Sequence, residues 1–156
     1  MGNERRGEGD YKSAFKYYTK AAELGNANAH YNLSVMYYLG QSVEKDEKKQ
    51  VYHLEVAAIG GHVLARHNLG CHEGNNGRME RAVKHFTIAA NMGYDESMKA
   101  LWKCHAMGLV KKDDLTATLR AHQAVVDATK SPQRKEAEEF FETNERSQEK
   151  TNLGDS

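Results

Sequence analysis

The chain has 156 residues, of which 39% are hydrophobic, and its 22 lysines and arginines balance its 22 aspartates and glutamates. With no excess of either charge, nothing draws the protein to nucleic acid or to a membrane surface. The two cysteines form no disulfide framework, no signal-peptide core follows the N-terminus, and no apolar run reaches the ~18 residues of a membrane span, so we expect an intracellular, cytoplasmic protein.

Apolar residues at helical spacing, separated by glycine-containing turns, predict seven helices in chain order. Their expected ranges are 10–24, 27–39, 45–59, 63–73, 78–92, 95–107 and 113–128. Before them we expect a disordered segment, 1–9, which is charged and rich in glycine. The repeat domain should span 10–130, followed after Pro132 by a charged capping helix, 131–146, and a disordered tail, 147–156.

A short phrase of two alanines and a nearby glycine recurs along the chain. Its copies read Ala21-Ala22-Glu23-Leu24-Gly25, Ala57-Ala58-Ile59-Gly60-Gly61 and Ala89-Ala90-Asn91-Met92-Gly93, with a weaker copy at Ala124-Val125. They start about 35 residues apart, a period typical of stacked two-helix units that bury their apolar faces against their neighbours. The last glycine of each full copy should end a helix with a positive φ.

Two further columns repeat with this phrase. A small residue is followed four positions later by a leucine, in the pairs Ala29 and Leu33, Ala65 and Leu69, and Ser97 and Leu101. Positions i and i+4 share one helix face, so the small residue lets a neighbouring helix approach while the leucine fills the remaining space. We therefore expect all three leucines to be buried.

These columns resemble the Sel-one-like repeat family, a variant of the tetratricopeptide α-solenoid. The resemblance is carried by Gly61-His62-Val63-Leu64-Ala65-Arg66-His67-Asn68-Leu69-Gly70 and by the run from Gly40-Gln41-Ser42-Val43 through Tyr52 to Gly61, and it covers about residues 9–128. The chain departs from the family pattern at Ser42, where the family has a second glycine, and at Trp102, in a column of small residues. The resemblance implies an all-α, right-handed solenoid of antiparallel helix-turn-helix repeats, which we expect to end in a C-terminal capping helix. It also implies a non-catalytic scaffold that holds other proteins together.

In the related tetratricopeptide domains the first helix of each pair lines a concave groove that holds a peptide or a partner helix. Carried onto this chain, that geometry places six residues on the groove: Tyr31, Val35, His67, Cys71, Lys99 and Lys103. We expect a protein or peptide partner with an apolar end and an acidic end, and no cofactor. By this alignment we expect the first helix to have no partner helix, so that Tyr11 and Phe15 leave an N-terminal edge open either to self-association or to the preceding repeats of a longer array.

The alternative hypothesis is a metal-binding or redox module. His67 and Cys71 stand four positions apart on one helix face, and Cys104 follows one unit later. A closed site would need ligands from three helices, and free cysteines are commonly small, buried apolar residues. A catalytic pair of Cys104 with His72 or His105 would need a lowered thiol pKa, which the middle of a helix does not supply. We therefore expect no enzyme activity.

Overall fold

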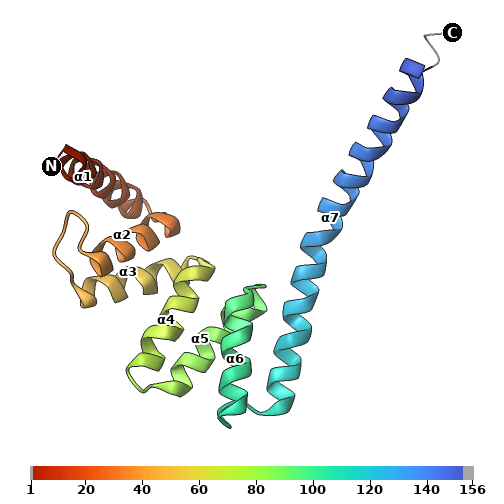
Figure 1. The fold of residues 1–156 in the computed structure, drawn as a ribbon. Coiled ribbons are helices and arrows are strands. Elements are labelled where there is room, and N and C mark those ends of the chain that lie inside the picture. The colour runs from red at the N-terminus through yellow and green to blue at the C-terminus, as the bar shows by residue number, and fades with distance from the viewer. Residues whose placement is uncertain (1, 153–156) are drawn as a thin grey trace.

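The structure, a computed structural model, describes residues 2–152, and over that range it consists of seven helices and no strand (Figure 1). The helices are α1 (Gly2–Glu23), α2 (Ala27–Leu39), α3 (Glu47–Ile59), α4 (Val63–Asn75), α5 (Met79–Asn91), α6 (Asp95–Ala106) and α7 (Lys112–Asn152). Each helix from α2 to α6 packs against the helix before it and the helix after it. The predicted all-α solenoid is therefore confirmed.

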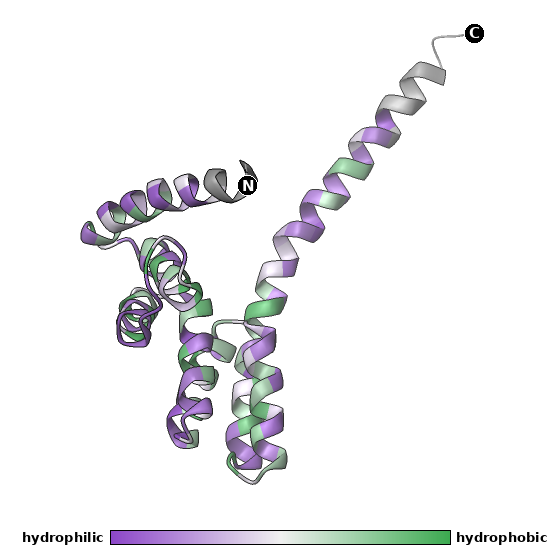
Figure 2. Ribbon diagram, turned by 60° about the vertical axis from the view of Figure 1, so that its left-hand side comes forward, coloured by the Kyte–Doolittle hydropathy of each residue, from purple (hydrophilic) through white to green (hydrophobic). Residues whose placement is uncertain are grey.

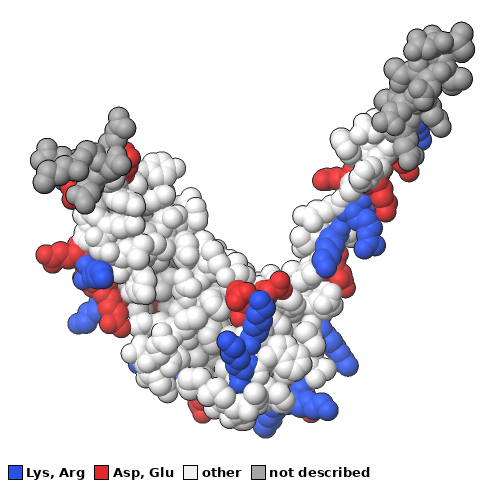
Figure 3. Space-filling view, viewed as in Figure 1, with Lys and Arg blue, Asp and Glu red and all other residues white. Residues whose placement is uncertain are grey.

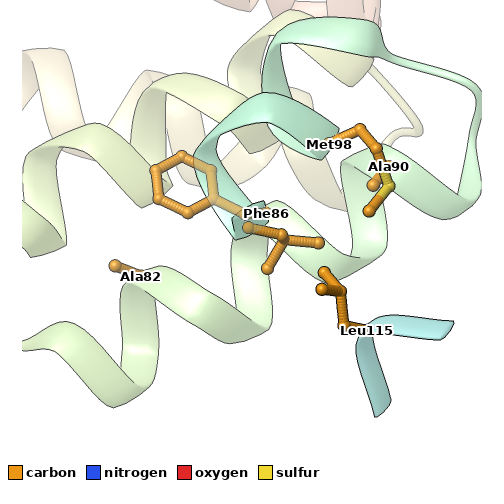
Figure 4. Close-up of a cluster of buried hydrophobic side chains, with 6 residues drawn as sticks. Ala82, Phe86, Ala90, Met98 and Leu115 are labelled. Atoms are coloured by element: carbon orange, nitrogen blue, oxygen red, sulfur yellow. The ribbon is translucent and has the colours of Figure 1, made fainter. Parts of the chain in front are cut away.

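Three buried clusters run along the array, each joining the helices of adjacent units. The first holds Ala22, Ala29 and Leu33, the second Leu54, Ala57, Ala58, Ala65 and Leu69, and the third Ala82, Phe86, Ala90, Met98, Leu101 and Leu115. Figure 4 shows the third cluster, with Phe86, Met98 and Leu115 brought together from α5, α6 and α7. Leu33, Leu69 and Leu101 are 2%, 3% and 1% exposed, so the predicted core column is confirmed.

The recurring alanine phrase has one structural cause. At the end of α1, α3 and α5 the chain turns at Gly25, Gly61 and Gly93, whose φ angles are 84°, 88° and 93°. The next residue then donates its backbone N–H to the carbonyl of the first alanine, over 3.0–3.1 Å, in the pairs Asn26 to Ala21, His62 to Ala57 and Tyr94 to Ala89. Glycine is required because an L side chain is strained at these angles.

The loop between α2 and α3 explains the first departure from the repeat pattern. Ser42 has a φ of 62° and is the one described residue other than glycine with a positive φ. The family places glycine there, and the left-handed region is the reason, since it disfavours a residue with a Cβ.

The C-terminal region differs from the sequence prediction. A break at Pro132 was expected, with a separate capping helix over 131–146, but α7 is one helix of 41 residues that contains Pro132. Residues 127–144 are exposed, so the carbonyl that Pro132 leaves without a helical donor can bond to water, and good helix formers follow it. Figure 2 shows mostly hydrophilic residues along the part of α7 that projects from the array. The first half of α7 packs on α5 and α6, so the cap lies there.

Two segments expected to be disordered are helical where the structure describes them. The backbone of α1 begins at Gly2, and α7 continues through Asn152. Neither segment contains a proline, and their many glutamate, arginine, lysine and glutamine residues favour a helix. Met1 and residues 153–156 lie outside the described range. On α1, Tyr11 is 41% exposed while Phe15 packs edge-on against Tyr37, so self-association through this edge stays a prediction.

The weak fourth copy of the phrase is out of register. Ala124-Val125, the weaker copy of the phrase, is exposed, and α7 instead buries Leu115, Thr118 and His122. The facing helix differs as well. Gly70 of α4 packs directly on Phe86 of α5, where even a Cβ would lie 2.6 Å from the ring, whereas the same column of α6 holds Trp102, which is 49% exposed. The close helix approach made at Gly70 is therefore not repeated at Trp102, in the unit where α7 packs in a shifted register.

Candidate functional site

The residues that precede α4 and α6 link each unit to the one before it. His62 lies before α4 and stacks on Tyr31 of α2, with ring centroids 4.3 Å apart and an angle of 18° between the planes. Tyr94 lies before α6 and meets His67 of α4 edge-on, at 5.1 Å. Tyr31 and His67 occupy the same column of successive repeats, as do His62 and Tyr94. A ring contact between the same two columns therefore recurs from one repeat to the next, stacked in the first and edge-on in the second.

His62 also caps α4 through its side chain. Its Nδ1 accepts a hydrogen bond from the backbone N–H of Ala65, at 3.2 Å, so the ring carries its proton on Nε2, which lies 3.4 Å from Oδ1 of Asn28. Burial lowers the pKa of His62 below its ordinary value, which favours this neutral form.

His67 joins α4 to α6. Its Nδ1 lies 2.8 Å from Oγ of Ser97, and its Nε2 lies 3.5 Å from Sγ of Cys71. Burial lowers the pKa of His67, and the neighbouring Glu96 partly opposes this effect. The pKa of Tyr94 is raised by burial first and then by the nearby Glu96, Tyr31 and Cys71. Side chains from three successive units thus lie close together.

Beside these rings lies a cavity of about 800 Å³ between α2, the start of α3 and the second half of α4, which we call the α2/α4 cavity. It is lined by Ser34, Val35, Tyr37, Tyr38, Leu39, Lys45, Asp46, Glu47, Gln50, Leu54, Asn68, Cys71, His72, Asn75 and Asn76. Its volume is that of a pocket able to hold a small ligand or a short piece of chain. Val35 and Cys71, two of the predicted groove residues, lie on its wall.

The six predicted groove residues therefore fall into three groups. Tyr31 and His67 belong to the ring contacts between units, Val35 and Cys71 line the α2/α4 cavity, and Lys99 and Lys103 are exposed on α6. Lys99 is not a free cation, because its Nζ lies 3.0 Å from Oε1 of Glu96. Figure 3 shows basic and acidic side chains together over α6. The basic end of the predicted groove, which was expected to face the acidic end of a partner, is therefore partly neutralised at Lys99.

The side chains proposed for a metal or redox site do not assemble. Within the described part of the chain, no group of three or more histidine, cysteine, aspartate or glutamate residues could hold a metal ion. Cys104 is buried in α6, and burial raises the pKa of both Cys104 and Cys71. A raised thiol pKa disfavours the thiolate that nucleophilic and metal-binding cysteines need. His67 and Cys71 remain a two-residue contact.

The sequence did not identify His62 or Tyr94 as site residues. Both precede the helices whose faces the periodicity describes, so helical spacing could not place them. A signal was nevertheless present, because each follows the last glycine of an alanine phrase and therefore recurs with the repeat.

Acidification is expected to destabilise the fold. Burial lowers the pKa of His53, His62, His67 and His85 in the folded chain, whereas an unfolded histidine has a pKa of about 6.5. Below that pH the unfolded chain binds more protons, so stability is complete above it and falls as the pH drops toward the folded pKa values. The melting temperature should therefore fall as the pH is lowered through this window.

The variant His62→Asn keeps a side chain that can cap α4 but does not titrate, so its melting temperature should depend less on pH than that of the unmodified chain. An equal dependence in the two proteins would show that His62 does not contribute to the effect.

No membrane-spanning segment is found among the described helices, since none combines sufficient length with sufficient apolarity.

Comparison with known proteins agrees with this architecture. The family model described as Sel1 repeat matches three consecutive stretches, 2–26, 27–62 and 63–94, more than half of the chain. A protective antigen from uropathogenic Escherichia coli, described as displaying an SLR fold, aligns with a TM-score of 0.61 and 23% identity over 70% of this chain and 25% of its own. A Sel1 repeat protein from Oxalobacter formigenes aligns with a TM-score of 0.59 and 22% identity over 70% of this chain and 48% of its own. The chain thus spans about a quarter and about half of these two proteins. No curated protein matched.

Proposed function

This chain belongs to the Sel1 repeat family, and from that premise we propose that it is a non-catalytic scaffold that binds a peptide or partner protein along α2, α4 and α6. Proteins of this family typically act as protein-interaction scaffolds. For this chain the bound segment would run past the ring contacts of Tyr31 and His67 and over the α2/α4 cavity.

The α2/α4 cavity is the observation that carries this proposal. It opens between two units, and its lining combines exposed apolar side chains with polar groups, as peptide-binding surfaces do. Tyr38 and Leu39 on its wall are 63% and 48% exposed, so a partner could remove considerable apolar surface from water there. A catalytic function has less support, because both cysteines are expected to be neutral thiols.

The direct test is selection of peptides from a phage-displayed random library on the immobilised chain. Peptides that bind should be synthesised and their affinity measured by fluorescence anisotropy. We expect Val35→Asp to weaken binding by about tenfold or more, because it places a charge against the apolar wall.

Ile59→Asp is the matched control, since Ile59 is 82% exposed and does not line the cavity. This variant should bind as the unmodified chain does. Equal affinity of the Val35→Asp and Ile59→Asp variants would refute the proposed surface, and failure of the library to yield any binding peptide would refute peptide binding itself.

A further inference from the structure

We propose that the α2/α4 cavity holds an uncharged, extended segment of the partner, whose backbone is hydrogen-bonded by the side-chain amides of Gln50, Asn68 and Asn75. This inference rests on the proposed function and adds the chemistry of the bound segment.

The three amides form no hydrogen bond within the part of the chain that the structure describes, although all three line the same cavity. Other asparagines nearby are engaged. Asn26 accepts from the N–H of Ala29, Asn32 donates to the carbonyl of Asn28, and Asn76 donates to the carbonyl of His72. Gln50 comes from α3 and the other two from α4, so the unengaged groups face one space from two helices.

A carboxamide offers two N–H donors and one carbonyl acceptor, which match the carbonyl and N–H of a peptide group. When a peptide group replaces water at one of these amides, the enthalpy of the new hydrogen bond is close to that of the bond to water which it replaces. Such bonds recognise an extended backbone and do not depend on its side chains. The part of the lining that α2 supplies, with Val35, Tyr38 and Leu39, would select an apolar side chain on the same segment.

The charges of the cavity favour an uncharged occupant. The lining carries one lysine, Lys45, and two carboxylates, Asp46 and Glu47, and Nε2 of His72 lies 3.8 Å from Oε1 of Glu47, so the excess is at most one negative charge. Asp46 is already engaged, because its carboxylate accepts the N–H of Lys49 at the start of α3. A phosphorylated or strongly acidic segment would therefore meet carboxylates without a cluster of cations to offset them.

The position of Cys71 allows a direct test of where a peptide binds. Its thiol is exposed on the cavity wall, while Cys104 is buried and serves as an internal reference. Peptides selected from the random phage library should slow the reaction of the Cys71 thiol with iodoacetamide. Mass spectrometry measures the extent of this alkylation over time. Their sequences should be uncharged around an apolar residue, and N-methylation of the backbone next to that residue should abolish protection.

Substitution of the amides completes the test. Asn68→Ala and Gln50→Ala should each weaken binding by about threefold to tenfold, the loss expected for one hydrogen bond. Asn32→Ala, on α2 and outside the cavity, should leave the affinity unchanged. Peptides that bind but leave the alkylation of Cys71 unaffected, or that are predominantly acidic or predominantly basic, would overturn this inference while leaving the scaffold function intact. Recovery of no peptide at all would instead remove the proposed function.

Discussion

Replacement of Leu69 by alanine is expected to lower the free energy of unfolding by about 2–5 kcal/mol. Leu69 is 3% exposed and fills the second buried cluster together with Leu54 and Ala65. Truncation leaves a cavity that α3 and α4 cannot close without losing their other contacts. In a linear array the damage is local, but it weakens coupling between adjacent units and so lowers the stability of the whole chain.

Urea denaturation followed by circular dichroism measures this effect. Leu24→Ala provides a matched control, because Leu24 is 89% exposed, and this variant should unfold within about 0.5 kcal/mol of the unmodified chain. A Leu69→Ala variant that unfolds at the same urea concentration as the control would show that the leucine column does not hold the units together.

Gly70→Ala is expected to destabilise the chain by about 1–3 kcal/mol, although glycine to alanine normally stabilises a helix by about 1 kcal/mol. The new Cβ would lie 2.6 Å from Cε1 and 2.8 Å from Cδ1 of Phe86, so α4 and α5 would have to separate. Phe86 is 7% exposed and has little room to move. The close approach of these two helices therefore depends on the missing side chain.

Two further variants isolate this effect, each measured by the same urea titration. Gly9→Ala lies within α1, where a Cβ meets nothing within 4 Å, so it should leave stability unchanged or raise it. Phe86→Leu should lower the free energy of unfolding less in the Gly70→Ala variant than in the unmodified chain, because the smaller leucine side chain relieves the clash with the Cβ of the new alanine. Equal losses in the two proteins would show that the strain does not arise between residues 70 and 86.

The regular part of the fold could be predicted because each repeat obeys the same packing rule. Small residues and leucines four positions apart fixed the faces of α2, α4 and α6, and the glycines marked the ends of α1, α3 and α5. The rule fails at the last unit, where Trp102 replaces a small residue and His122 enters the buried face of α7. The periodicity of the sequence cannot show this shift in the register of α7, because the register depends on how two particular side-chain surfaces fit together.

The candidate site was less accessible to sequence reasoning. The repeat columns predicted that Val35 of α2 and Cys71 of α4 share a surface, and both line the α2/α4 cavity, while their role in binding a partner stays a prediction. Sequence reasoning missed the pair of Glu96 and Lys99, although these residues stand three positions apart on α6 and that spacing is readable in the sequence. It could not reveal that Gln50 from α3 and Asn68 from α4 line the same cavity, because this arrangement arises between helices and the repeat pattern describes only one helix at a time.

The contact between Gly93 and Val125 has a mechanical consequence. A Cβ on Gly93 would lie 2.8 Å from Cγ1 of Val125, so α7 leaves the array at a point where it rests against a turn without a side chain. Beyond that point the helix projects for about 40 Å, at ~1.5 Å per residue. A difference of about 10° in the direction of α7 at Gly93 would therefore displace the far end of the helix by about 7 Å. The position of that end thus depends closely on how α7 packs against α5.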